Sequence, residues 1–176
     1  MSDSQAGRLS RDSGRFDEFY TGTAARMITQ IYLMVGDRAE AEDAVQEAYA
    51  RAWQRWRRVG AYDDPAAWVR VVAYRIAVSS WRRARLRRAA QQRSGPADPV
   101  AELSPDTVAL VAALRQISSS QRRAIVLHHL VGLTVREVAQ ETGASESAVK
   151  AQLSRGRQAL APLLRIDELT EVEERA

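Results

Sequence analysis

Cysteine is absent from this chain of 176 residues, and aromatic residues make up only 6% of it. Without cysteine the chain has no disulfide framework and no thiolate nucleophile, which is typical of a protein from a reducing compartment. Long apolar runs are also missing. None approaches the roughly 18 residues that a membrane-spanning helix needs, and residues 1–30 lack the apolar core of a secretory signal. These absences predict a soluble cytoplasmic protein, folded as one domain or as two small ones.

Sequence signatures of catalysis are missing as well. No serine lies in a Gly-x-Ser-x-Gly elbow, no Ser-His-Asp arrangement is visible, and no glycine-rich loop could hold a phosphate. His128 and His129 are neighbours, so on a helix they would point about 100° apart. That angle prevents both from binding one metal ion and favours a packing role. We therefore expect no enzyme activity, no metal and no cofactor.

Positive charge is plentiful, and it is unevenly distributed. The chain has 26 basic and 22 acidic residues, and Lys150 is the one lysine. Residues 57–93 hold ten arginines against two aspartates, a net charge of +8, and residues 114–165 have a net charge of +5. Residues 94–113 carry −3 and residues 166–176 carry −4. Two basic blocks predict two places where the chain meets a polyanion, although an arginine-rich surface can also serve solubility alone.

Apolar residues recur at helical spacing through most of the chain. One run covers residues 16–35 and ends at Gly36, and a second begins directly after it. Asp64 followed by Pro65 is a start signal for a third helix, and helical spacing returns from Thr107. No run alternates with a period of two, so the fold class is predicted to be all-α. The apolar stripe of the second helix comprises Ala41, Ala44, Val45, Ala48, Tyr49, Ala52, Trp53 and Trp56.

These helices divide between two small modules joined by a flexible linker. We expect the first module over residues 16–90, the linker over residues 91–108 and the second module over residues 109–165, because proline and glycine interrupt the periodicity between them. Residues 1–15, rich in Ser, Gly and Arg, are predicted to be a disordered tail. Residues 166–176 are predicted to be a separate acidic tail.

Residues 133–157 (LTVREVAQETGASESAVKAQLSRGR) have the pattern of a helix-turn-helix. Thr134 and Glu137 form a capping box for one helix, and Gly143 supplies the permissive backbone of the turn. Ser145 then caps a second helix. The outward side of that helix mixes short polar groups with cations, which suits the major groove of DNA, although a solvated basic hairpin has the same pattern. These outward residues are Ser147, Lys150, Ser154, Arg155 and Arg157.

Carboxylates crowd one side of the second predicted helix. Asp43 and Glu47 lie at i and i+4 with Gln46 beside them, opposite the apolar stripe. A metal site is disfavoured, because no histidine accompanies these residues and oxygen-ligand sites need a loop or a facing helix. Two interpretations remain open: a solvated polar face, or a docking surface for a protein that offers arginines.

Aromatic residues alternate with arginines along the third predicted helix. Trp68, in its first turn, is expected in the core, whereas Tyr74 and Trp81 could either pack or stack on unpaired bases. Stacking is worth about 1–3 kcal/mol per base, and the arginines at the end of the helix would contact phosphates. The arginines interleaved with the aromatic residues are Arg70, Arg75, Arg82 and Arg83.

Three segments, in this order, resemble extracytoplasmic-function (ECF) sigma factors of actinobacterial type: GDRAEAEDAVQEAYARAWQRW, DDPAAWVRVVAYRIAVSSWRR and LRQISSSQRRAIVLHHLVGLTVREVAQETGASESAVKAQLSRGR. The resemblance covers residues 16–165. It implies that the first module is sigma region 2 and the second is sigma region 4. It also implies a chain that is monomeric when free and that has core RNA polymerase and promoter DNA as partners. An anti-sigma partner, the promoter sequence and the role of the acidic tail are left open.

The resemblance also implies roles for individual residues. The acidic helix would dock on the coiled coil of the polymerase β′ subunit through Asp43, Gln46, Glu47, Arg51 and Trp53, and the chain would also contact the β flap of the polymerase. The −10 promoter element would meet a loop that captures a flipped base in relatives, and the helix after it, through Tyr62, Arg70, Tyr74, Arg75, Trp81, Arg82 and Arg83. The −35 element would meet Arg122, Arg123, Ser145, Glu146, Ser147, Lys150, Ser154, Arg155 and Arg157.

Two positions on the expected −10 face depart from the family pattern. Arg75 stands where the family often has Asn, and Ser79 stands where it often has Asp, so the −10 sequence preference of this chain is open. The alternative function is that of a stand-alone helix-turn-helix regulator. Such proteins usually dimerise over two half-sites, and the sequence offers neither a spare apolar helix for a dimer interface nor a ligand-sensing domain.

Overall fold

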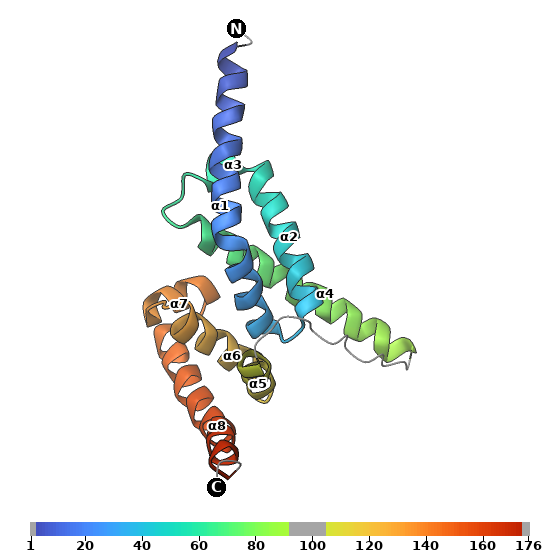
Figure 1. Ribbon diagram of the computed structural model, residues 1–176, viewed down its shortest axis with the longest axis vertical. Coiled ribbons are helices and arrows are strands. Elements are labelled where there is room, and N and C mark those ends of the chain that lie inside the picture. The colour runs from blue at the N-terminus through green and yellow to red at the C-terminus, as the bar shows by residue number, and fades with distance from the viewer. Residues whose placement is uncertain (1–2, 92–104, 174–176) are drawn as a thin grey trace. The chain divides into compact units, whose positions relative to one another are not determined.

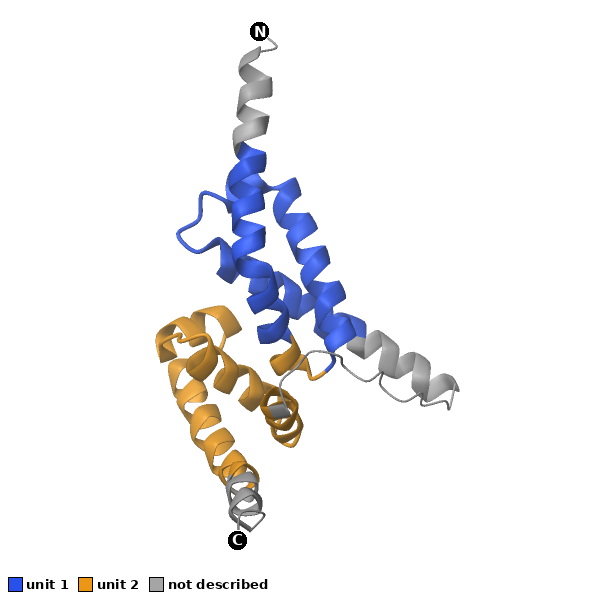
Figure 2. Cartoon of the chain, viewed as in Figure 1, with its two compact units in different colours: residues 1–31, 37–94 blue, residues 32–36, 95–176 orange. Residues whose placement is uncertain are grey.

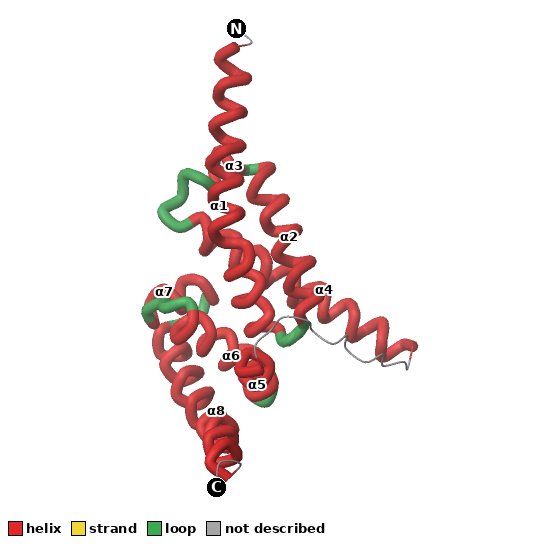
Figure 3. The backbone as a smooth tube through the Cα atoms, in the orientation of Figure 1, coloured by secondary structure: helices red, strands yellow, loops and turns green. Residues whose placement is uncertain are grey.

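The computed structural model describes the backbone of residues 3–91 and 105–173, and the side chains of residues 12–80 and 106–164. Every regular element in these ranges is helical, which confirms the predicted fold class (Figures 1 and 3). None of the described helices is long and apolar enough to cross a membrane. The elements are α1 (Asp3–Val35), α2 (Arg38–Gln54), α3 (Trp56–Val59), α4 (Pro65–Gln91), α5 (Pro105–Leu114), α6 (Ser119–Ile125), the π-helix η1 (Val126–Leu130), α7 (Val135–Thr142) and α8 (Glu146–Glu173).

The chain divides into two compact units (Figure 2). Unit 1 comprises residues 1–31 and 37–94, and unit 2 comprises residues 32–36 and 95–176. Two helical units agree with the predicted architecture. Residues 92–104, which make up most of the predicted linker, lie outside the described residues.

Small side chains allow α2 to pack along α4 in unit 1. Ala44, Ala48 and Ala52 on α2 are buried, and so are Ala73 and Ala77 on α4. Alanines spaced four residues apart form a low ridge on each helix, so the two backbones can approach closely over several turns. The core of unit 1 therefore rests on small residues along these helices, and its large aromatic side chains gather at one end.

The start and stop signals of the first helices lie where the sequence predicts them. Gly36 has a φ of 80°, in the left-handed region that favours glycine, and it follows the last residue of α1. The Asp37 carboxylate accepts a hydrogen bond from a backbone N–H 3.1 Å away and caps α2. The Asp64 carboxylate accepts one from the N–H of Ala67 at 3.0 Å, and Pro65 begins α4.

Helix α1 begins at Asp3, so the prediction of a disordered tail over residues 1–15 is wrong for residues 3–15. This segment has no apolar stripe of its own, and its sequence alone therefore predicts no helix. Extending a helix costs far less than nucleating one, because each added residue gains a hydrogen bond. The amphipathic run from Phe16 supplies the nucleus. At the other end α8 continues to Glu173, so most of the predicted acidic tail is helical too.

The helix-turn-helix of unit 2 has the predicted caps. The Thr134 hydroxyl accepts from the N–H of Glu137 at 3.3 Å, and the Glu137 carboxylate accepts from the N–H of Thr134 at 2.7 Å. Gly143, with a φ of 72°, ends α7, and the Ser145 hydroxyl starts α8 by accepting from the N–H of Ala148 at 3.2 Å. The buried apolar side chains of these two helices are Val138, Ala139, Val149, Leu153 and Leu160.

The segment before the helix-turn-helix differs from the prediction. The sequence predicts one regular helix over residues 121–130, whereas α6 ends at Ile125 and the π-helix η1 follows it. The N–H of Val131 donates to the carbonyl of Val126, five residues earlier, at 3.0 Å. A wider turn of this kind keeps the same apolar side inward, so hydrophobic periodicity cannot distinguish it from an α-helix.

Candidate nucleic-acid and protein-binding surfaces

One side of α2 carries the predicted docking residues. Asp43, Gln46, Glu47 and Arg51 are all exposed, and we call them the acidic face. Their spacing of three, one and four residues places them together, opposite the buried alanines. The Arg51 Nε donates to the Glu47 Oε1 at 2.8 Å, and both side chains are about half exposed. An exposed pair of this kind adds little stability, so these side chains can turn to a partner's charges without loss of the helix.

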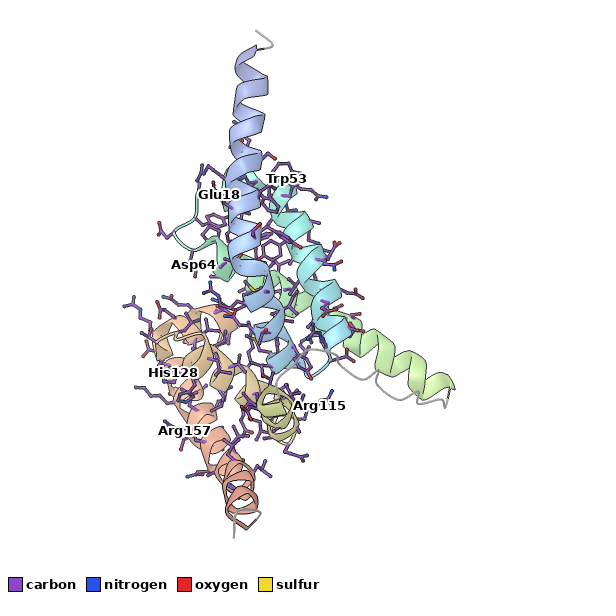
Figure 4. All side chains as sticks on the ribbon, in the orientation of Figure 1. Glu18, Trp53, Asp64, Arg115, His128 and Arg157 are labelled. Atoms are coloured by element: carbon purple, nitrogen blue, oxygen red, sulfur yellow. The ribbon has the colours of Figure 1, made fainter. Side chains whose placement is uncertain are left out.

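Trp53 lies near the end of the acidic face and is 46% exposed, although it continues the apolar stripe of α2 (Figure 4). Its ring contacts that of Phe16 on α1, with the centroids 5.1 Å apart, and Phe16 in turn contacts the buried Trp56, also at 5.1 Å. The indole is therefore held by the core while nearly half of its surface is open. This is the situation of an aromatic anchor at a protein interface.

A partly buried hydrogen-bond pair joins α1 to α2. The Tyr49 hydroxyl lies 2.6 Å from the Thr23 hydroxyl, which lies 2.5 Å from the carbonyl of Phe19. Thr23 has one hydroxyl proton and donates it to the carbonyl, so Tyr49 donates to Thr23. Burial raises the pKa of Tyr49 above its usual 10.0. The pair is one of the contacts that join α2 to α1.

The residues predicted to meet the −10 element lie in the loop before α4 and on α4 itself. Tyr62, in the loop, is 38% exposed, Tyr74 is half-buried and Arg75 is exposed. Ser79, one turn beyond Arg75, is exposed as well. The structure thus places Tyr62 and Arg75 on the surface and leaves their DNA contacts a prediction. The predicted residues whose side chains lie outside the described residues are Trp81, Arg82 and Arg83.

Arg70 is only 4% exposed, so the prediction that it contacts DNA is wrong for this structure. It lies three residues before Ala73 and seven before Ala77, and it shares their buried side of α4. A guanidinium in this position needs its hydrogen-bond acceptors inside the protein, because a desolvated charge without them is costly. Trp68, predicted in the core, is half-buried.

The first half of α8 presents the predicted row of polar and cationic side chains. Ser147, Lys150 and Ser154 follow one side of the helix at spacings of three and four residues. Gly156 faces the opposite way, where a Cβ atom would lie 3.0 Å from the Ile125 Cγ1 of α6. The helix therefore packs tightly on one side and is open on the other, as a helix that enters the major groove must be. The exposed residues are Ser145, Glu146, Ser147, Lys150, Ser154, Arg155 and Arg157.

Arg122 and Arg123 on α6 are half-buried and hydrogen-bonded within unit 2. The Arg123 Nη2 donates to the carbonyl of Glu141 at 3.2 Å, near the C-terminal end of α7, where a cation is favoured by the helix dipole. The Arg122 Nη2 donates to the carbonyl of Ile117 at 3.5 Å. Arg123 thus braces α7 against α6, and phosphate contacts by either arginine stay a prediction.

The two histidines lie on η1 and contact each other. Their ring centroids are 4.7 Å apart and their planes are inclined by 71°. The Nδ1–H of His128 donates to the carbonyl of Leu133 at 2.7 Å and so fixes the turn that precedes α7. Burial lowers the pKa of His129, and the charges of His128 and Arg157 lower it further. Within the described ranges no group of three His, Cys, Asp or Glu residues could hold a metal ion.

The sequence interpretation did not single out α3. Arg57 and Arg58 on this short helix are exposed, directly before the Tyr62 loop. The sequence does contain a signal for this surface, namely two adjacent arginines between apolar residues at the start of the basic block over residues 57–93. It was hidden because a four-residue helix shows no periodicity.

Two separate helical units, one with a helix-turn-helix and one with an acidic face beside arginine-rich helices, define a DNA-binding protein that also has a surface suited to a protein partner. Comparison with known families refines this class. Sigma-70 region 2 matches residues 11–87, and Sigma-70, region 4 matches residues 107–160.

Individual relatives agree with these matches. The chain is 30% identical over 162 residues to the ECF RNA polymerase sigma factor SigK of Mycobacterium sp. (strain KMS), covering 83% of this chain and 81% of SigK. It is 32% identical over 164 residues to the ECF RNA polymerase sigma factor BldN of Streptomyces coelicolor, covering 86% of this chain and 60% of BldN. The chain belongs to the ECF sigma factor family.

The fold is also known from solved structures. The sigma factor RpoE in complex with the anti-sigma factor NepR from Bartonella quintana superimposes with a TM-score of 0.72. The alignment covers 86% of this chain and 98% of that chain at 22% sequence identity. This likeness concerns the fold alone.

Proposed function

We propose that this chain directs transcription initiation by binding core RNA polymerase through the acidic face and promoter DNA through both units. One observation carries the proposal: α2 exposes a row centred on carboxylates, whereas α8 exposes a row of hydroxyls and cations. A regulator that binds DNA alone gains no phosphate contact from the first row, because carboxylates repel phosphates. A subunit that has to be recruited by an enzyme needs both. The chain supplies binding, and the polymerase, in the cytoplasm, performs the chemistry.

Recognition of the −35 element is assigned to α8. Ser147, Lys150 and Ser154 line the open side of the helix, where short polar and cationic groups can hydrogen-bond to base edges in the major groove. Arg155 and Arg157 flank this row and suit bidentate contacts to phosphates. Base contacts would specify the sequence, and phosphate contacts would fix the register of the helix on the duplex.

Recognition of the −10 element is assigned to the loop before α4 and to α4. Tyr62 is exposed and can stack on an unpaired base, an interaction worth about 1–3 kcal/mol. Binding of the open strand but not of the duplex shifts the melting equilibrium toward the open state. The unit would therefore assist melting by trapping bases as they unpair, with no input of chemical energy.

Docking on the polymerase is assigned to the acidic face together with Trp53. Asp43 and Glu47 can form charge-assisted pairs with guanidinium groups of a partner helix. The Arg51–Glu47 pair would open at little cost, since both side chains are half exposed. The half-exposed Trp53 ring would supply the apolar anchor beside these charges.

The proposal is tested by electrophoretic titration of a labelled promoter fragment with the free chain and with the chain plus core polymerase. If docking holds the two units at the spacing of the −35 and −10 elements, binding is weak without core enzyme and strong with it. Equal affinity in both titrations would contradict the proposal. RpoE of B. quintana forms a complex with an anti-sigma factor, and such a partner for this chain stays a prediction.

A further inference from the structure

The short helix α3 has one buried side and exposes two arginines on the other. Trp56 and Val59 are 7% and 1% exposed, whereas Arg57 and Arg58 between them are exposed. In a helix with 3.6 residues per turn, burial of positions i and i+3 turns the two positions between them outward. The backbone that carries both arginine side chains is therefore fixed by the buried side of the helix.

The buried side and the C-terminal end of α3 are held by three sets of contacts. The Trp56 ring contacts Phe16 and Phe19, with centroid distances of 5.1 and 5.2 Å. Gly60, directly after α3, lies against the same ring, because a Cβ atom there would be 2.9 Å from the Trp56 Cε2. The Arg15 Nη2 of α1 donates to the carbonyl of Gly60 at 3.3 Å. The end of α3 thus has little freedom to shift.

The same backbone continues into the loop that carries Tyr62. The N–H of Ala61 donates to the carbonyl of Arg58 at 3.2 Å, and the N–H of Tyr62 donates to the carbonyl of Val59 at 3.1 Å. Tyr62 and the two arginines are therefore displayed by one hydrogen-bonded segment. A nucleotide whose base meets Tyr62 has a phosphate on each side of its sugar, and those phosphates would pass close to α3.

The charge of these arginines is available to a ligand. Among the residues that the structure describes, Arg57 and Arg58 take part in no ion pair, in contrast to Arg38 and Arg51 on α2. The Asp64 carboxylate, at the far end of the loop, accepts a hydrogen bond as the cap of α4. A guanidinium group without a carboxylate partner is well suited to bidentate binding of a phosphate.

We propose that Arg57 and Arg58 bind the backbone phosphates of the promoter strand whose unpaired base meets Tyr62. The proposal rests on the promoter binding proposed above and adds two residues to it. Tyr62 takes the base, and α3 holds the strand on which that base lies, with contacts that do not depend on sequence. Because the two parts belong to one rigid segment, strand capture and base capture occur together.

The test uses fluorescence anisotropy of a labelled single-stranded oligonucleotide that carries the −10 non-template sequence of a promoter transcribed by the holoenzyme. The affinity of the holoenzyme for this oligonucleotide is measured across a salt series, because each single-strand phosphate contact contributes about 0.7 to the slope of log K against log salt. The double variant Arg57→Gln/Arg58→Gln is expected to lose about 1.4 from that slope and to bind about tenfold more weakly at 0.15 M salt. Arg57→Lys/Arg58→Lys, which retains both charges, is expected to keep the slope.

The matched control is Arg26→Gln/Arg136→Gln, which removes the same charge from exposed positions on α1 and α7 and is expected to leave the slope unchanged. Core polymerase affinity is measured in parallel. An unchanged slope in the α3 glutamine variant overturns the proposal, and so does a loss of core affinity, which would place these arginines on the polymerase. If the unaltered holoenzyme fails to bind the oligonucleotide, the proposed −10 recognition fails together with this inference.

Discussion

Gly156 of α8 lies directly against Ile125 of α6. A Cβ atom at Gly156 would lie 3.0 Å from the Ile125 Cγ1 and 3.4 Å from its Cδ1. This contact sets how closely α8 approaches α6. It also couples the stability of unit 2 to the position of the exposed row on α8.

The first prediction concerns this contact. Gly156→Leu is expected to lower the free energy of unfolding of unit 2 by about 2 kcal/mol, because a large side chain cannot enter a filled space without moving Ile125 or α8. Urea unfolding followed by circular dichroism measures the change. Ala159→Leu adds the same side chain at an exposed position of α8 and is expected to cost far less. Equal unfolding free energies for the two variants would contradict the packing described here.

The second prediction concerns the hydrogen bond between Tyr49 of α2 and Thr23 of α1. Tyr49→Phe removes the donor to Thr23 and is expected to lower the free energy of unfolding by about 1 kcal/mol, the usual net value of such a bond. Thr23→Val removes the other partner, and a double-mutant cycle gives the coupling between them. A coupling of zero would show that the two hydroxyls do not interact in the folded protein.

The third prediction is a change of stability with pH that depends on the same tyrosine. Its pKa is raised in the folded state, chiefly by burial, so the unfolded chain releases the proton first. The stability that this group contributes is fully present below pH 10.0, the ordinary pKa of tyrosine, and is lost as the pH rises toward the folded value. Between these values the stability of the unaltered protein should fall more steeply than that of Tyr49→Phe. Parallel curves for the two proteins would contradict the raised pKa.

Local signals in the sequence are sufficient to predict much of this fold. Thr134, Glu137 and Gly143 cap and end α7 as predicted, because capping depends on neighbours within a few residues. The same holds for Asp64 at the start of α4. Predictions fail where the burial of a side chain depends on residues that are distant in the sequence. The burial of Arg70 depends on what covers α4, and no local pattern contains that information.

Partial burial is also difficult to predict. Trp53 continues the apolar stripe of α2, yet it is 46% exposed, whereas Ala52 in the same turn is fully buried. The exposed residues of the acidic face were predictable, since they lie opposite that stripe and helical spacing alone separates the two sides. The arginines of α3 were not, because a single turn gives no repeat to follow.

The fourth prediction tests the proposed docking surface. Asp43→Arg places a positive charge where a partner's guanidinium groups would bind, and it is expected to lower the affinity for core polymerase by at least about a hundredfold. Circular dichroism should be unchanged, because Asp43 is exposed. Asp106→Arg makes the same charge change at an exposed position of α5 and should bind core polymerase normally. Equal affinities for the two variants would exclude the acidic face as the docking surface.

The fifth prediction concerns the phosphate contacts proposed for α8. With a −35 duplex and the holoenzyme, Arg155→Gln and Arg157→Gln are each expected to reduce the slope of log K against log salt by about 0.9, the value for one phosphate on double-stranded DNA. Ser147→Ala should leave the slope unchanged and alter the preference among base substitutions in the duplex. An arginine variant with an unchanged slope would show that its side chain contacts no phosphate.

The most direct measurement is run-off transcription with purified core polymerase on genomic promoter fragments, with the RNA 5′ ends mapped. We predict defined start sites that require the added chain, that disappear with Asp43→Arg and that persist with Asp106→Arg. Core polymerase that associates with this chain yet starts RNA at no defined site, or that starts equally well with Asp43→Arg, would contradict this prediction.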